Sequence, residues 1–145
     1  MAIKQTTPDD AYARLQADDA VVYLDVRSEP EFERGHAPNA INVPVTFLVP
    51  GAPARPNPDF VAVVGKVLGP NQEILVGCQV GGRSQRACEI LAEAGYTNLA
   101  NIQGGFGGMR DRAGNLVAKG WVDSGLPVET GQPAGRSYAD LKAKA

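Results

Sequence analysis

Two stretches of the chain have the continuous apolar, β-branched character that is typical of parallel strands buried on both faces. They are AVVYLDV at residues 20–26 and EILVGC at residues 73–78. Residues 40–43 and 98–102 have the same character over a shorter length. The pattern therefore predicts a sheet whose main strands are central and largely parallel.

Helical patterns alternate with these strands. Residues 7–10, TPDD, form a cap followed by proline and acidic residues, and residues 57–59, NPD, open a second helix in the same way. The clearest helix is predicted at residues 83–94, because its apolar positions share one face: Ala87, Ile90, Leu91 and Ala94. Alternating strands and helices predict an α/β fold, with chemistry at the carboxyl ends of the strands.

The remaining segments lack a regular period. Residues 44–58 contain five prolines, and residues 104–125 contain seven glycines, so both are predicted to be irregular connections. From residue 130 on the chain is polar, and we expect a short helix or a frayed end there. The predicted organisation is a single domain at residues 1–129 and a polar C-terminal tail at 130–145.

Length and charge narrow the class of protein. A chain of 145 residues matches one domain, and a net charge of −2 gives no overall attraction to nucleic acid or an anionic membrane. The N-terminus lacks the pattern of a secretory signal, and no segment is apolar enough to span a bilayer. We therefore expect a cytoplasmic protein with no nucleic-acid or membrane partner.

The cysteines and the single histidine bear on redox and metal chemistry. Cys78 and Cys88 are too few for a disulfide framework and form no CxxC pair, so free thiols are expected. His36 has no second histidine with which to complete a zinc site. The sequence thus predicts neither a metal nor a cofactor.

The segment CQVGGRS, residues 78–84, carries the strongest chemical signal. Cys78 ends a predicted strand and lies next to a predicted helix N-terminus, whose free N–H groups favour an anion. Gly81 and Gly82 let the loop turn its N–H groups inward around the sulfur. Arg83 adds positive charge, and Ser84 is a candidate cap for the helix. We interpret Cys78 as a reactive thiolate, whereas Cys88, in the middle of a helix, is interpreted as structural.

At this point the chain resembles the rhodanese-like sulfurtransferases over nearly its whole length. Three motifs carry the resemblance in order: DVRSEPEFERGHAPNAINVP at 25–44, CQVGGRS at 78–84, and GWVDSGLPVE at 120–129. The resemblance implies one rhodanese domain, an α/β fold with about five parallel strands and helices on both faces. It also implies that Cys78 accepts sulfur from a donor such as thiosulfate and passes it to an acceptor such as cyanide or a thiol. The loop from Gln79 through Val80, Gly81, Gly82 and Arg83 to Ser84 would bind the substrate.

Two departures from the family pattern concern the donor. Gln79 and Val80 are neutral where thiosulfate-specific members often carry basic residues, so a persulfide carrier that relays sulfur to a protein partner remains an alternative. The segment between Gly105 and Trp121 is longer than in the shortest relatives. It is either a surface loop or a cover for the pocket, in which case Arg110, Arg112 and Lys119 are candidate substrate-binding residues.

Arg27 and His36 each have a structural interpretation, and a phosphatase is the other class of enzyme that this pattern suggests. Arg27 either binds an anion or simply pairs with Asp25, and His36 is interpreted as structural. A phosphatase of related fold would have five residues between cysteine and arginine. Only four separate Cys78 from Arg83, which favours sulfur over a phosphoryl group.

Overall fold

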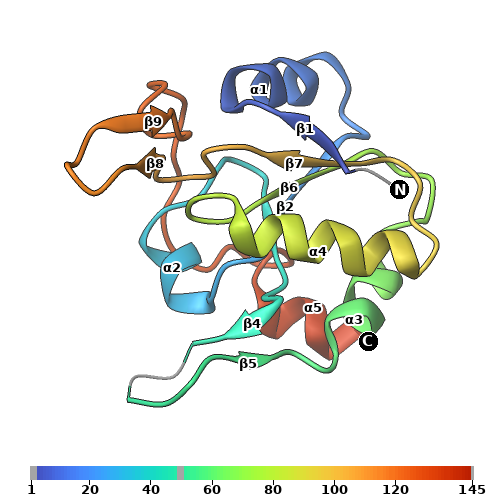
Figure 1. Cartoon of the computed structure of the whole chain (residues 1–145). Coiled ribbons are helices and arrows are strands. Elements are labelled where there is room, and N and C mark those ends of the chain that lie inside the picture. The colour runs from blue at the N-terminus through green and yellow to red at the C-terminus, as the bar shows by residue number, and fades with distance from the viewer. Residues whose placement is uncertain (1–2, 49–50, 145) are drawn as a thin grey trace.

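A five-stranded parallel sheet forms the centre of the molecule (Figure 1). The computed structural model describes residues 3–48 and 51–144. Each strand pairs in parallel with its neighbours in the order β1 (Lys4–Thr6), β7 (Leu99–Ile102), β6 (Ile74–Gly77), β2 (Val22–Asp25) and β3 (Ile41–Asn42). The predicted α/β fold is confirmed. The edge strand β1 was not predicted, because its three residues, KQT, are polar.

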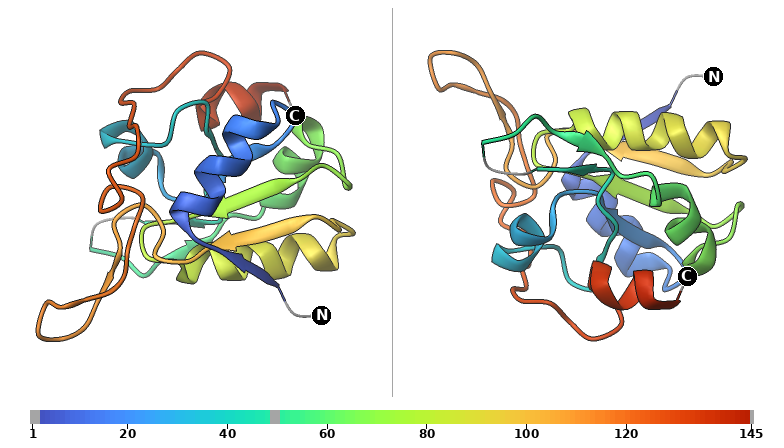
Figure 2. Two further views of the ribbon diagram at one scale, coloured as in Figure 1. Left: turned by 90° about the horizontal axis from the view of Figure 1, so that it is seen from above. Right: turned by 90° about the horizontal axis from the view of Figure 1, so that it is seen from below.

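Helices cover both faces of the sheet (Figure 2). On one face α1 (Pro8–Ala17) packs through Ala11 into an apolar cluster that includes Tyr23, Trp121 and Phe32 of α2 (Glu29–Arg34). On the other face the second cluster joins α3 (Phe60–Val67), α4 (Gly82–Glu93) and α5 (Tyr138–Lys144) to β2 and β6. The central strands are buried on both sides, as their apolar runs predict.

The start of α4 corrects one expectation about residues 78–84, the segment that we call the active loop. The helix begins at Gly82, one residue earlier than predicted, and its N-cap is Gly81, not Ser84. Gly81 has φ 118°, a conformation that side-chain-bearing residues rarely adopt. Because Gly81 takes the cap position, Ser84 falls within the first turn of the helix, where its hydroxyl faces the loop.

The C-terminal segment packs onto the domain. Tyr138 and Leu141 of α5 are both buried in the cluster that contains α3. The Nδ2 of Asn57 donates to the Tyr138 hydroxyl at 3.1 Å. Residues 130–145 are mostly polar, so the sequence analysis overlooked Tyr138 and Leu141. These two residues are three positions apart and therefore lie on one face of a helix.

Two short hairpins occupy the segments that were predicted to be irregular. β4 (Thr46–Phe47) pairs with β5 (Arg55–Pro56) in the proline-rich segment, and β8 (Met109–Arg110) pairs with β9 (Leu116–Ala118) in the glycine-rich one. The β8–β9 hairpin projects from the carboxyl end of the sheet in Figure 1. Within residues 3–48 and 51–144, no helix has the length and apolar character needed to span a membrane.

Candidate active site

The thiol of Cys78 lies in the loop between β6 and α4. The N–H of Gly81 points to Sγ at a distance of 3.0 Å, and the Oγ of Ser84 lies 3.3 Å from the same sulfur. Cys78 is only 1% exposed, so these polar groups meet the sulfur away from bulk water. A buried sulfur that faces hydrogen-bond donors at a helix N-terminus is suited to carry negative charge.

Ser84 links the sulfur to polar side chains on two other strands. Its Oγ contacts the Oδ1 of Asn101 on β7, and the Nδ2 of Asn101 donates to the Oε1 of Gln5 on β1 at 2.8 Å. Gln5 in turn donates to the Oε1 of Gln85 on α4 at 2.7 Å. The sequence patterns did not indicate Asn101 or Gln5 as parts of the site, because Asn101 is a single polar residue on a short strand and Gln5 lies in a strand whose three residues are all polar.

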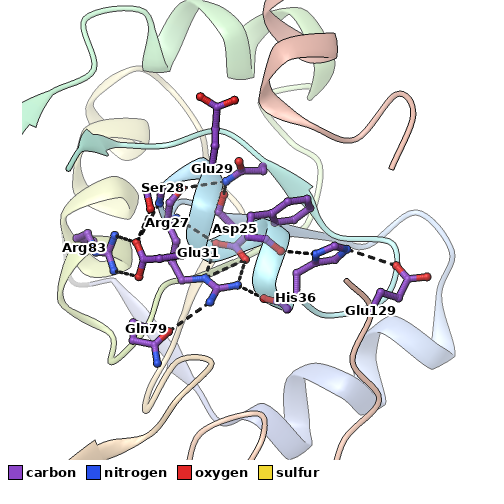
Figure 3. A network of polar contacts seen from close by, with 12 residues as sticks. Asp25, Arg27, Ser28, Glu29, Glu31, His36, Gln79, Arg83 and Glu129 are labelled. Atoms are coloured by element: carbon purple, nitrogen blue, oxygen red, sulfur yellow. Dashed lines mark hydrogen bonds and ion pairs between the residues drawn. The ribbon is translucent and has the colours of Figure 1, made fainter. Parts of the chain in front are cut away.

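Arg83 does not stand free at the rim of the loop. Its two Nη atoms donate to the two carboxylate oxygens of Glu31 on α2, at 2.7 and 2.8 Å (Figure 3). Burial by itself would raise the pKa of Glu31, but the bonds from Arg83 and Ser28 outweigh it and lower the pKa to about 2. The ion pair therefore fastens α2 to the active loop.

Glu31 was missed by the sequence analysis, although one signal was available. Residues 28–31, SEPE, match a capping box, and in the structure Glu31 Oε1 accepts from the backbone N–H and the hydroxyl of Ser28. That signal places Glu31 in the first turn of a helix. It does not indicate that the carboxylate reaches Arg83, 52 residues further along the chain.

Arg27 is buried next to the active loop and pairs with Asp25. Its guanidinium donates to both carboxylate oxygens of Asp25 and, through Nη2, to the carbonyl oxygen of Gly35 at 2.6 Å. The remaining Nη1 donates to the Oε1 of Gln79 at 3.2 Å, and the guanidinium carbon lies 4.4 Å from the centre of the Phe106 ring. Arg27 thus orients the side chain that directly follows Cys78 (Figure 3).

The beginning of the glycine-rich segment is hydrogen-bonded to the active loop. The N–H of Phe106 donates to the carbonyl oxygen of Cys78 at 2.7 Å, and the N–H of Gly107 donates to that of Gln79 at 2.9 Å. A Cβ at Gly105, where φ is 58°, would lie 2.4 Å from the Cys78 carbonyl oxygen. Only glycine permits this approach.

The three cationic candidates of this segment lie on or beside the β8–β9 hairpin. Arg110 pairs with Asp123 at 2.8 Å and also donates to the carbonyl oxygen of Gly107. Arg112 and Lys119 are exposed. The structure thus places Arg110 in contacts within its own segment.

His36 and Cys88 lie in the interior of the domain. His36 stacks on Phe32, and its Nδ1 lies 2.7 Å from the Phe32 carbonyl oxygen, which can only accept. Its Nε2 lies 3.6 Å from Glu129. Burial raises the pKa of the Cys88 thiol to about 12, which favours the protonated thiol near neutral pH.

Comparisons with known proteins agree with this architecture. A family model described as the rhodanese-like domain matches residues 7–111. The chain belongs to the rhodanese-like family. The strand–loop–helix unit around Cys78 lies inside the matched region.

Relatives and solved structures extend the comparison. The chain is 41% identical over 108 residues to thiosulfate sulfurtransferase 16, chloroplastic, of Arabidopsis thaliana, an alignment that covers 74% of this chain and 78% of that protein. It is 37% identical over 110 residues to thiosulfate sulfurtransferase 18 of the same plant, over 74% of this chain and 71% of that protein. Among solved structures, Rv0390 from M. tuberculosis superposes with a TM-score of 0.75 at 28% identity, and the match covers 90% of this chain and all of that one.

Proposed function

We propose that this protein is a sulfurtransferase that carries sulfane sulfur on Cys78. The observation that supports this most directly is the pair of polar contacts to Sγ, from the Gly81 N–H at 3.0 Å and the Ser84 hydroxyl at 3.3 Å. Such contacts favour a thiolate as nucleophile and then hold the charge of a persulfide. Two relatives that bear the name thiosulfate sulfurtransferase support thiosulfate as the donor.

The reaction proceeds in two half-reactions through a covalent intermediate. The Cys78 thiolate attacks the outer sulfur of thiosulfate, the sulfur–sulfur bond of the donor breaks, and sulfite leaves with its electron pair. The acceptor, cyanide or a thiolate, then attacks the outer sulfur of the persulfide. The bond to Sγ breaks, and Cys78 leaves as a thiolate ready for another cycle.

Donor binding in this proposal relies mainly on the loop N–H groups from Gln79 to Ser84. Arg83 was expected to orient the anion directly, but both its Nη atoms bond to Glu31, and Arg27 bonds to Asp25. A cavity of about 260 Å³ beside the loop is lined by Arg27, Arg34, Glu31 and Gln79. We assign the anionic donor to this side of the loop, where Arg34 is an exposed cation.

A second candidate is a persulfide carrier that turns over thiosulfate poorly and passes sulfur to a protein. The neutral side chains of Gln79 and Val80, together with the pairing of Arg27 and Arg83 to carboxylates, favour it. Steady-state turnover with thiosulfate and cyanide separates the two. A dedicated carrier turns over slowly yet still takes up sulfur on Cys78.

Intact-mass analysis after thiosulfate treatment tests the shared chemistry. We expect a gain of one sulfur, about 32 Da, in the wild type and in Cys88→Ser, and none in Cys78→Ser. A gain that persists without Cys78, or that vanishes without Cys88, contradicts the proposal. Circular dichroism of both variants confirms that the fold is retained.

A further inference from the structure

Two cavities flank the Cys78 loop, and they differ in charge. The cavity described above, with two arginines and Glu31, lies on the α2 side. The other, of about 440 Å³, lies between the loop and the β8–β9 hairpin, and none of its lining residues is charged. We call this second one the amide cavity, because four of its lining residues carry side-chain amides: Gln5, Gln85, Asn101 and Gln103.

The amide cavity shares its wall with the group that holds the sulfur. Gly81, whose N–H lies 3.0 Å from Sγ, lines it, and so does Asn101, which contacts the Ser84 hydroxyl. The outer sulfur of a persulfide lies about 2 Å beyond Sγ. Cys78 itself does not line the cavity, so a peptide anchored here must place its cysteine past the edge of the loop to reach the carried sulfur.

The rim of the amide cavity is apolar. Val80, Met109 and Ala118 line it, and the first two are 43% and 41% exposed. Leu116 and Val117 of the same hairpin are exposed as well. Four of the eight exposed large hydrophobic residues in the described part of the chain thus gather on the loop and this hairpin, which is typical of a surface that binds a partner.

These side chains select against small charged acceptors. Amide side chains both donate and accept, as a peptide group does, whereas a carboxylate or sulfonate needs a cation that the amide cavity does not offer. Uncharged amides with an apolar rim match a neutral peptide segment. The charged cavity, in contrast, matches an anionic donor.

We propose that the amide cavity is the acceptor site and that it binds an uncharged peptide segment bearing the acceptor cysteine of a protein. This rests on the proposed function of Cys78. The acceptor thiolate attacks the outer sulfur of the persulfide, a new sulfur–sulfur bond forms on the peptide, and the bond to Sγ breaks. The electron pair returns to Cys78 as a thiolate, so the transfer needs no further reactant.

The test places a carboxylate in the cavity and compares acceptors of different charge. Ala118→Asp changes a lining residue, and Val122→Asp is the matched control, since Val122 is 52% exposed, lies outside the apolar rim and does not line the cavity. Each protein is loaded with sulfur and mixed with one of three acceptors: the blocked peptide acetyl-Ala-Cys-Ala-amide, the cationic peptide acetyl-Lys-Cys-Lys-amide, or cyanide. Mass spectrometry follows the loss of the persulfide.

We expect Ala118→Asp to slow transfer to the neutral peptide about tenfold relative to cyanide and to accelerate transfer to the cationic peptide. Val122→Asp should leave both ratios unchanged. A faster transfer of sulfur to the cationic peptide cannot arise from misfolding of the variant. The proposal is overturned when both variants behave alike, or when peptide and cyanide rates change together.

Loading with inorganic polysulfide in parallel with thiosulfate separates the two proposals. When thiosulfate fails to load the wild type, the donor assignment is wrong, while the polysulfide-loaded protein still tests the amide cavity. When loading succeeds and the peptide ratios do not depend on residue 118, only the acceptor site is wrong.

Discussion

The guanidinium of Arg83 and the carboxylate of Glu31 form a two-pronged ion pair, with Nη–Oε distances of 2.7 and 2.8 Å. Arg83 lies in the first turn of α4, directly after the loop that begins at Cys78, and Glu31 lies in the first turn of α2. This ion pair holds the loop against α2. It also neutralises the positive charge of Arg83, which would otherwise attract an anionic donor. In the proposed function, donor affinity and loop stability therefore depend on the same carboxylate, that of Glu31.

Replacing Glu31 by Gln should improve thiosulfate binding. Without the carboxylate Arg83 keeps its charge for the donor, so we expect the KM for thiosulfate to fall about three- to tenfold. Gln can still complete the capping box with Ser28. Glu29→Gln removes a carboxylate from the same turn and is the control, because Figure 3 places Glu29 pointing away from Arg83. An unchanged or higher KM in Glu31→Gln would falsify this expectation.

The same pair should make stability depend on acid. The pKa of Glu31 falls from its ordinary 4.5 to about 2, so the ionised form is favoured by folding. A lowered folded pKa gives stability that is complete above 4.5 and is lost as the pH falls toward 2. Urea unfolding of wild type and Glu31→Gln between pH 7 and pH 2 measures this. The difference in free energy of unfolding should shrink below pH 4.5, and a constant difference would exclude the ion pair as its cause.

Removing the Ser84 hydroxyl should slow uptake of sulfur. Ser84→Ala deletes both the polar contact to Sγ and the link from Sγ to Asn101, and we expect the rate of persulfide formation to fall about tenfold. Ser124→Ala, whose hydroxyl bonds to the Gly120 carbonyl oxygen, serves as control. If Ser84 only fills space, Ser84→Ala forms the persulfide at the wild-type rate.

A methyl group at Gly105 should disrupt the packing behind the active loop. Gly105→Ala places a Cβ 2.4 Å from the Cys78 carbonyl oxygen, and we expect a loss of about 3 kcal/mol or more in the free energy of unfolding. Gly114→Ala is the matched control, since Gly114 also has positive φ but no heavy atom within 4 Å of the added Cβ. It should lose only about 1 kcal/mol, the cost of the backbone conformation. Equal losses in chemical denaturation would mean that the contact is not tight.

We propose that the cations of the β8–β9 segment add a long-range attraction to the anionic donor, although they do not line the cavity on the α2 side of the loop. Replacing Arg110, Arg112 and Lys119 together by Ala should raise the KM for thiosulfate and leave the KM for cyanide nearly unchanged. Lys66→Ala on α3, in a separate surface cavity, controls for net charge. Because Arg110 pairs with Asp123, a second variant that keeps Arg110 isolates the two exposed cations. No change in the thiosulfate KM in either variant would rule out a role for these residues in donor binding.

The sequence by itself determined the main strands and indicated the candidate site. The apolar runs at residues 20–26 and 73–78 have the composition of strands buried on both faces. The glycines after Cys78 allow a tight turn before a helix. These are local preferences, expressed over a few neighbouring residues. They fixed the parallel sheet, the strand–loop–helix unit and the identity of the candidate nucleophile.

Only the tertiary structure decided what surrounds the sulfur. Arg83 meets Glu31 across 52 residues, and Asn101 meets Gln5 across 96, so neither contact leaves a local pattern. The order of strands brings β1 and β7 together and places their amides beside Ser84. In the same way the packing of α5 against α3 turned a polar tail into part of the core. Side-chain pairing depends on how distant elements pack, which the order of residues along the chain does not express.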